Sequence, residues 1–326
     1  MQTRDEFVAE RSARWAELES LLLDDRNLHA LKPTAISRVV TLYRAVCADL
    51  MRARSLGCGA DVTGHLDAIA SRAHNALYGP EPYRLSSALE LVTAGFPLTL
   101  RRRFRFFLFS LVLFGAPFAL GVYGAMHSSE FAYGVIPAEM LQEAAESYRA
   151  GFANGRGSGE DAMMAGFYVY NNVGIAFRCF ATGILFGLGS VFFLVYNGLL
   201  IGTVLGHVIA SGAGFNVLTF VCGHAPFELT AIVVSGGAGL QMGWALVATQ
   251  GRSRIGSLRA QGKELLELVV GAALMLIVAA AIEGFWSPSA VNPSLKWVVS
   301  GVGWLFVILY FALGGRRWGG RKAEAR

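Results

Sequence analysis

The chain has 326 residues, of which 54% are hydrophobic and only 16% are charged. Soluble globular proteins carry about 25% charged residues, so this composition excludes a wholly soluble protein and indicates the membrane class. The net charge of +5 does not indicate nucleic-acid binding, because the basic residues gather at the ends of apolar segments, where they determine membrane topology. The four cysteines include no Cys-x-x-Cys pair, so they suggest neither a disulfide framework nor a zinc knuckle. We expect no cofactor.

Residues 1–100 predict a cytoplasmic helical domain with no cleavable signal peptide at its start. Apolar residues recur at helical spacing in three runs, within 8–22, 36–50 and 62–77. Pro33 suits the first turn of the second helix, and Gly79-Pro80 ends the third. Residues 85–100, which follow, are expected to form a short interfacial helix. Amphipathic helices of this kind bury their apolar faces against one another or against the membrane surface.

Residues 101–326 predict an all-α, polytopic membrane bundle, because apolar runs of about 20 residues each suffice to cross a bilayer. We place about six spans, near 105–126, 172–191, 193–211, 227–248, 266–284 and 297–314. Basic residues before the first span, in the loop 252–263 and in the C-terminal tail assign these segments to the cytoplasm, whereas the acidic loop 127–170 is extracytoplasmic. These assignments require an odd number of crossings between 170 and 250, and hence a tight turn near 190–194. The predicted location is the bacterial inner (cytoplasmic) membrane, with both termini cytoplasmic.

Glycines recur every four residues in the predicted second and third spans and are dense in the fourth. Such small-residue ridges let helix backbones approach closely. We expect the ridges to serve internal packing, with a homo-oligomer interface as the alternative.

Few charged side chains occur in the centre of the membrane region. Between residues 172 and 250 the only acidic or basic side chains are Arg178, His207, His224 and Glu228. A carboxylate in the bilayer is costly unless it is protonated, paired or hydrated, so intramembrane ionisable residues are functional candidates. His224 and Glu228 are four residues apart and share one helix face. Glu283 is a further isolated carboxylate, in the fifth span.

The six-span topology predicts that polar residues converge near the outer face. Asn171 and Asn172 begin the second span from outside, His224 and Glu228 begin the fourth, and Glu283 ends the fifth. Three separate spans therefore bring polar side chains to a similar depth.

Three interpretations of this cluster remain open. The polar residues form a structural cluster held by hydrogen bonds, line a proton- or ligand-binding pocket, or bind a metal ion through one histidine and two carboxylates. The second histidine of a His-Glu-x-x-His metalloprotease helix is missing. Arg178 either extends toward the outer headgroups or pairs with one of the carboxylates. Asn197 lies near the inner end of the third span and is expected to be separate.

Several stretches together resemble the stage II sporulation protein M family of integral membrane proteins (the DUF95 type). They are residues 42–54, 96–97, 171–173, 196–202, 224–232, 238–240 and 282–288. They include the His-x-x-x-Glu of His224 and Glu228 and the Ile-Glu-Gly-Phe-Trp around Glu283. One departure is Ala225, where the family usually has glycine after the histidine.

The resemblance implies a multi-pass scaffold that, in endospore formers, works with peptidoglycan-degrading partners. The expected function is therefore a non-enzymatic, envelope-linked scaffold or assembly factor. Its partners are the lipid bilayer and other membrane or envelope proteins, with peptidoglycan-remodelling factors among the candidates. The alternative is a transporter-like protein that uses the His/Glu cluster.

Overall fold

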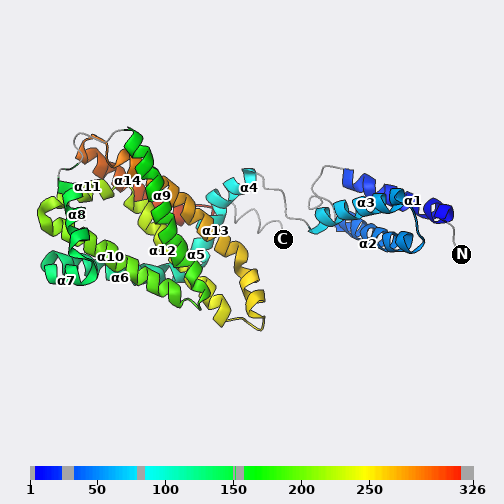
Figure 1. Cartoon of the computed structure of the whole chain (residues 1–326), viewed down its shortest axis with the longest axis horizontal. Helices are drawn as coiled ribbons and strands as arrows, with labels where there is room; N and C mark the ends of the chain where they lie inside the picture. Colours follow the sequence, from blue (N-terminus) through cyan, green and yellow to red (C-terminus); the bar gives the residue numbers. More distant parts are fainter. Residues whose placement is uncertain (1–3, 24–32, 79–84, 150, 152–157, 317–326) are drawn as a thin grey trace. The chain divides into compact units, whose positions relative to one another are not determined.

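A computed structural model of the chain describes residues 4–23, 33–78, 85–149, 151 and 158–316. These residues are helical or lie in short connections. The chain divides into two compact units, Met1–Arg84 and Leu85–Arg326 (Figure 1).

The first unit is a bundle of three helices, α1 (Arg4–Leu23), α2 (Pro33–Ser55) and α3 (Ala60–Tyr78). The apolar positions that recur at helical spacing in the sequence meet in one core, which includes the buried residues Trp15, Leu18, Val39, Val46, Leu66 and Ile69. One charged group is also buried there. The Asp49 carboxylate accepts hydrogen bonds from the Trp15 indole at 2.9 Å and from Arg11 at 3.2 Å. The predicted helical domain thus has its own core.

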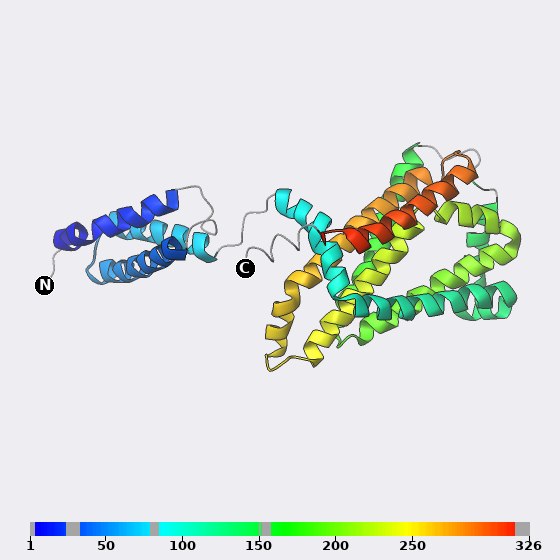
Figure 2. The ribbon, with the colours of Figure 1, turned by 180° about the vertical axis from the view of Figure 1, so that it is seen from behind.

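The second unit contains the long apolar helices and the shorter helices that connect them. Its elements are α4 (Leu85–Glu90), the π-helical turn η2 (Leu91–Gly95), α5 (Phe96–Arg102), α6 (Phe104–His127), α7 (Ser129–Val135), α8 (Ala138–Arg149), α9 (Ser158–Ala181), η3 (Thr182–Ile184), α10 (Leu188–Val208), η4 (Ile209–Ala213), α11 (Gly214–Val221), α12 (Ala225–Val247), α13 (Arg254–Ala281), the π-helical turn η5 (Ile282–Trp286) and α14 (Pro293–Leu313). Figure 2 shows α5 beside α13 and α14, with which it is in contact. The part of the predicted interfacial segment 85–100 that lies in η2 and α5 therefore packs against the bundle.

Five helical stretches in the described part of the chain are long and apolar enough to cross a membrane. They are Phe104–His127, Leu188–Val221, Ala225–Val247, Arg254–Trp286 and Pro293–Leu313. The predicted all-α polytopic bundle is therefore confirmed. The remaining long helix, α9, is less apolar but packs along α12 and α13.

The packing contacts give the six long helices alternating directions. Parallel α6 and α10 touch through successive turns, with Gly198, Gly202 and Gly206 against the carbonyls of Phe114, Phe118 and Val122. Helix α12 runs opposite to α10, since Gly243 meets Gly187 and Gly236 meets Leu194. Helix α13 runs opposite to α12, and α9 runs opposite to α13 because Ala165 near the start of α9 meets Gly284 after the end of α13.

One consequence is that the basic residues around positions 101–105, 252–263 and 316 gather at one end of the bundle, here called the basic end. Arg101 donates hydrogen bonds to the carbonyls of Phe311 and Gly314, which ties the end of α5 to the end of α14. Arg103 forms an ion pair with Glu264 of α13 at 2.6 Å. The opposite end carries α7, α8, η5 and the start of α12.

The predicted bounds of the second span, 172–191, are wrong. The helix ends at Ala181, the reversal runs through 182–187, and α10 begins at Leu188. The turn is not visible in a hydropathy pattern because its residues Leu185 and Phe186 are themselves apolar and exposed. Gly187 completes the reversal with a φ of +87°, a left-handed conformation that suits glycine.

The glycine ridges serve internal packing, as expected. A Cβ on Gly202 would lie 2.2 Å from the carbonyl oxygen of Phe118, and one on Gly183 would lie 2.2 Å from that of Gly239. Only glycine therefore permits these backbone contacts.

Candidate functional site

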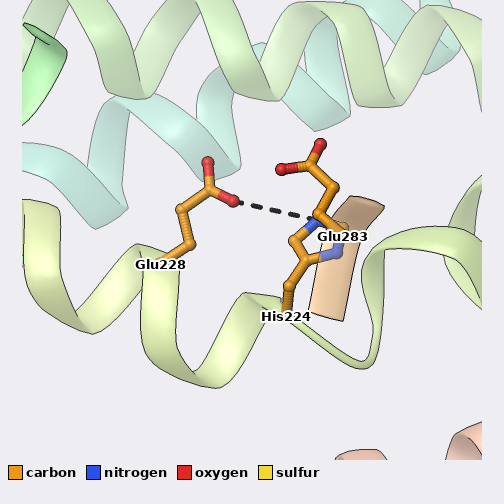
Figure 3. Close-up of side chains that lie close together, drawn as sticks. All are labelled: His224, Glu228 and Glu283. Atoms are coloured by element: carbon orange, nitrogen blue, oxygen red, sulfur yellow. Dashed lines mark ion pairs between the residues drawn. The ribbon is translucent and has the colours of Figure 1, made fainter. Parts of the chain in front are cut away.

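The polar cluster at the opposite end is built from the start of α12 and the end of α13. His224 is the N-cap residue of α12, and Pro226 follows in the first turn, a position that suits proline. Glu228 lies one turn on, so its Oε2 is 3.8 Å from His224 Nε2. Glu283 comes from η5. One potential ligand atom from each of the three residues lies within 4.8 Å of the other two (Figure 3).

Hydrogen bonds from neighbouring elements orient these side chains. Ser287 Oγ lies 3.1 Å from His224 Nδ1, which leaves Nε2 on the side of Glu228. Asn172 Nδ2 donates to Glu283 Oε2 at 3.5 Å, and Asn171 Nδ2 donates to Asn172 Oδ1 at 3.0 Å. Figure 3 shows the carboxylates of Glu228 and Glu283 turned toward one another. The structure therefore brings together five of the predicted candidates. The predicted position of Asn171 and Asn172 at the start of a span is wrong, because both lie in the middle of α9.

Ser287 and Lys296 also support the cluster, although neither was predicted as a site residue from the sequence. The Lys296 ammonium is buried and donates to the carbonyl oxygens of Ser287 and Ser289, both at 2.7 Å. It thereby fixes the turn after η5 that carries Ser287. A lysine inside an apolar helix is itself a signal, and Ser287 stands one helical turn after Glu283 in the 282–288 stretch.

Arg178 and Asn197 lie elsewhere. Arg178 is six residues beyond Asn172 on α9, about 9 Å along the helix axis toward the basic end, and its side chain is exposed. No ion pair joins it to Glu228 or Glu283 within the described residues. The alternative in which Arg178 pairs with a carboxylate is therefore not found there, and the expected extension toward the outer headgroups does not fit a position toward the basic end. Asn197 donates to the carbonyl of Phe193 in its own helix at 2.7 Å and stays separate, as expected.

The three ionisable groups line a cavity of about 580 Å³. Its remaining wall is mostly apolar and comes from α6, α8, α10, α11 and the first turns of α12. His224 is only 5% exposed and Glu283 only 9%, so both groups are screened from bulk solvent. Cavities with a few convergent polar groups in an apolar wall are typical of small-molecule sites. The arrangement suits the binding of a proton, a small polar or cationic molecule, or a metal ion.

Sequence comparisons agree with the membrane architecture. Residues 110–288 match the profile of Stage II sporulation protein M, and residues 5–79 match a separate domain of unknown function, DUF8413. The 42–54 and 96–97 stretches therefore lie outside the sporulation-protein match. An uncharacterized protein of Methanocaldococcus jannaschii is 25% identical over 120 residues, which cover 36% of this chain and 67% of that protein. No solved structure matches the chain.

The Stage II sporulation protein M profile covers more than half of the chain and includes His224, Glu228 and Glu283. It also covers α9, α10, α12 and α13, which form most of the bundle. The chain therefore belongs to the stage II sporulation protein M family of integral membrane proteins.

Proposed function

We propose that this protein binds a small polar or cationic ligand within the membrane and works as a transporter-like protein at that site. The observation that carries the proposal is the cavity whose wall includes His224, Glu228 and Glu283. In a purely structural cluster, other side chains would pack around the polar groups on all sides. Polar groups on a cavity wall instead stay available to a ligand. His224 and Glu228 are 3.8 Å apart, which exceeds a hydrogen bond, so the Glu228 carboxylate retains capacity to bind.

The orientation of the site follows from the positive-inside rule. The basic end of the bundle faces the cytoplasm under this rule, so both termini are cytoplasmic. The cavity then lies toward the outer side of a bacterial inner (cytoplasmic) membrane. A ligand would enter from the extracytoplasmic side.

Cysteine accessibility tests this proposal. In a cysteine-free parent, single cysteines would replace Ala144 and Ala225, which line the cavity. A membrane-impermeant thiol reagent added from outside should label both, as it labels a cysteine at the exposed position Glu139. A cysteine at Ala238, which is 0% exposed in the core, is the negative control. Labelling of the two cavity positions no faster than that of Ala238 would contradict an accessible site.

A second candidate function is the envelope-linked scaffold or assembly factor. It is favoured by the first unit, which has its own core and forms a unit distinct from the bundle. Such a unit is suited to hold a partner protein, with peptidoglycan-remodelling factors as the class that the family resemblance implies. Cross-linking in intact cells would test this function. Loss of all cross-linked partners on deletion of residues 1–84 would support it, and an unchanged set of partners would count against this unit as the binding arm.

A further inference from the structure

We propose that His224, Glu228 and Glu283 form a binding site for a divalent transition-metal ion, with zinc as the best-matched ion. The inference narrows the ligand of the proposed cavity site and therefore rests on the proposed function. An imidazole nitrogen with two carboxylate oxygens is a ligand set that zinc accepts in proteins. Magnesium and calcium prefer oxygen ligands alone, so the histidine favours a transition metal.

The distances are compatible with such a site after a small adjustment. The three ligand atoms lie within 4.8 Å of one another. Tetrahedral zinc with bonds of about 2.1 Å places its ligands about 3.4 Å apart. The side chains must therefore move by on the order of 1 Å. Both glutamates have enough rotatable bonds for this, and Figure 3 shows their carboxylates already turned toward one another.

The hydrogen bonds around the cluster match those that support metal ligands. A metal-bound histidine commonly donates its other ring N–H to a neighbouring oxygen, which fixes the tautomer. Ser287 Oγ lies 3.1 Å from His224 Nδ1; in the tautomer in which Nδ1 donates to this oxygen, the lone pair of Nε2 faces Glu228. Asn172 donates to Glu283 Oε2, which holds the second carboxylate in place.

Charge balance supports a cation at this position. The two carboxylates lie in or next to membrane spans, where a charged side chain is costly. The ion pair that Glu228 forms within the described residues is the one with His224 at 3.8 Å. The buried ammonium of Lys296 donates to backbone carbonyls of Ser287 and Ser289, so these bonds do not neutralise the carboxylates. A divalent ion bound between the two carboxylates would offset their negative charge.

The cavity supplies the last coordination position. Three protein ligands leave one position of a tetrahedral ion open, as in catalytic zinc sites. All three residues line the cavity of about 580 Å³, so a water molecule or a small anion could occupy that position. Glu283 lies in the π-helical turn η5, and π-helical turns are frequent at functional sites.

Metal binding to the purified full-length protein tests the inference. The protein would carry an affinity tag without histidine, be stripped with a chelator in detergent, and be titrated with zinc chloride by calorimetry. We expect one zinc ion per chain, checked by elemental mass spectrometry. Glu228→Gln and Glu283→Gln should each weaken binding at least tenfold, and Ser287→Ala by about tenfold, as for other groups that orient a metal ligand.

Matched controls come from the same end of the bundle. His127→Gln and Glu139→Gln change exposed residues outside the cluster and should leave zinc affinity unchanged. Binding of cobalt(II) to the unaltered protein, read from its visible absorption, should show a tetrahedral spectrum and does not depend on the folding of any variant. No stoichiometric binding, or equal affinity in the Glu228, Glu283 and control variants, would overturn the metal site.

The outcomes separate this inference from the proposed function. If zinc does not bind while the thiol reagent labels the cavity cysteines, the metal site is refuted. An organic molecule then remains the candidate ligand of the cavity. If zinc binds while the thiol reagent does not label the cavity cysteines, the metal site is supported and the transporter-like function is refuted.

Discussion

The contact between α6 and α10 makes a sharp prediction for Gly202→Ala. The new Cβ would lie 2.2 Å from the carbonyl oxygen of Phe118 and 3.0 Å from its Cα. An ordinary contact needs about 3.4 Å or more, so the backbones must separate by about 1 Å. Tilting one helix does not relieve the overlap, because Gly198 and Gly206 make the same contact one turn away on each side.

The expected cost of this overpacking is about 1–3 kcal/mol. At about 2–4 °C per kcal/mol for a unit of this size, the apparent Tm in detergent should fall by several degrees. The matched control is Gly301→Ala on α14, where nothing lies within 4 Å of the new Cβ. Its Tm should stay constant or rise, since alanine favours helices over glycine. A Gly202→Ala protein as stable as the unaltered one would refute the close backbone contact.

Three further predictions concern the cluster, the first unit and the topology. Glu228→Gln and Glu283→Gln should show a coupling of about 0.5 kcal/mol or more in a double-mutant cycle on thermal stability; strictly additive effects would argue against a shared site. Asp49→Ala should destabilise the isolated first unit by about 1–3 kcal/mol in denaturant unfolding followed by circular dichroism, because buried donors lose their acceptor; an unchanged midpoint would show that the carboxylate is dispensable. An impermeant reagent applied outside intact cells should label a cysteine at Glu139 and not one at Arg252, and the reverse pattern would invert the assigned orientation.

Helix positions were predictable wherever a periodic or apolar pattern had a clear boundary. The span predicted at 227–248 is α12, Ala225–Val247, because Pro226 begins it and a polar loop follows it. The reversal before α10 was not predictable, because Leu185 and Phe186 continue the apolar run through the turn. A hydropathy pattern indicates whether side chains are apolar, whereas a chain reversal depends on the torsion angles of the backbone. The φ of +87° at Gly187 becomes evident only in the folded chain.

The sequence by itself determined the membrane class, the separate first helical unit and the pairing of His224 with Glu228, because composition and helical spacing are local properties. The predicted topology placed Glu283 at the depth of this pair, and the tertiary structure brought it within 4.8 Å of both residues. The tertiary structure also decided that Ser287 and Lys296 support the cluster, whereas Arg178 does not. It further decided that His224, Glu228 and Glu283 line a cavity. These results depend on where helices distant in sequence cross. A glycine ridge along one helix marks a surface suited to close packing, but it does not specify which helix packs there.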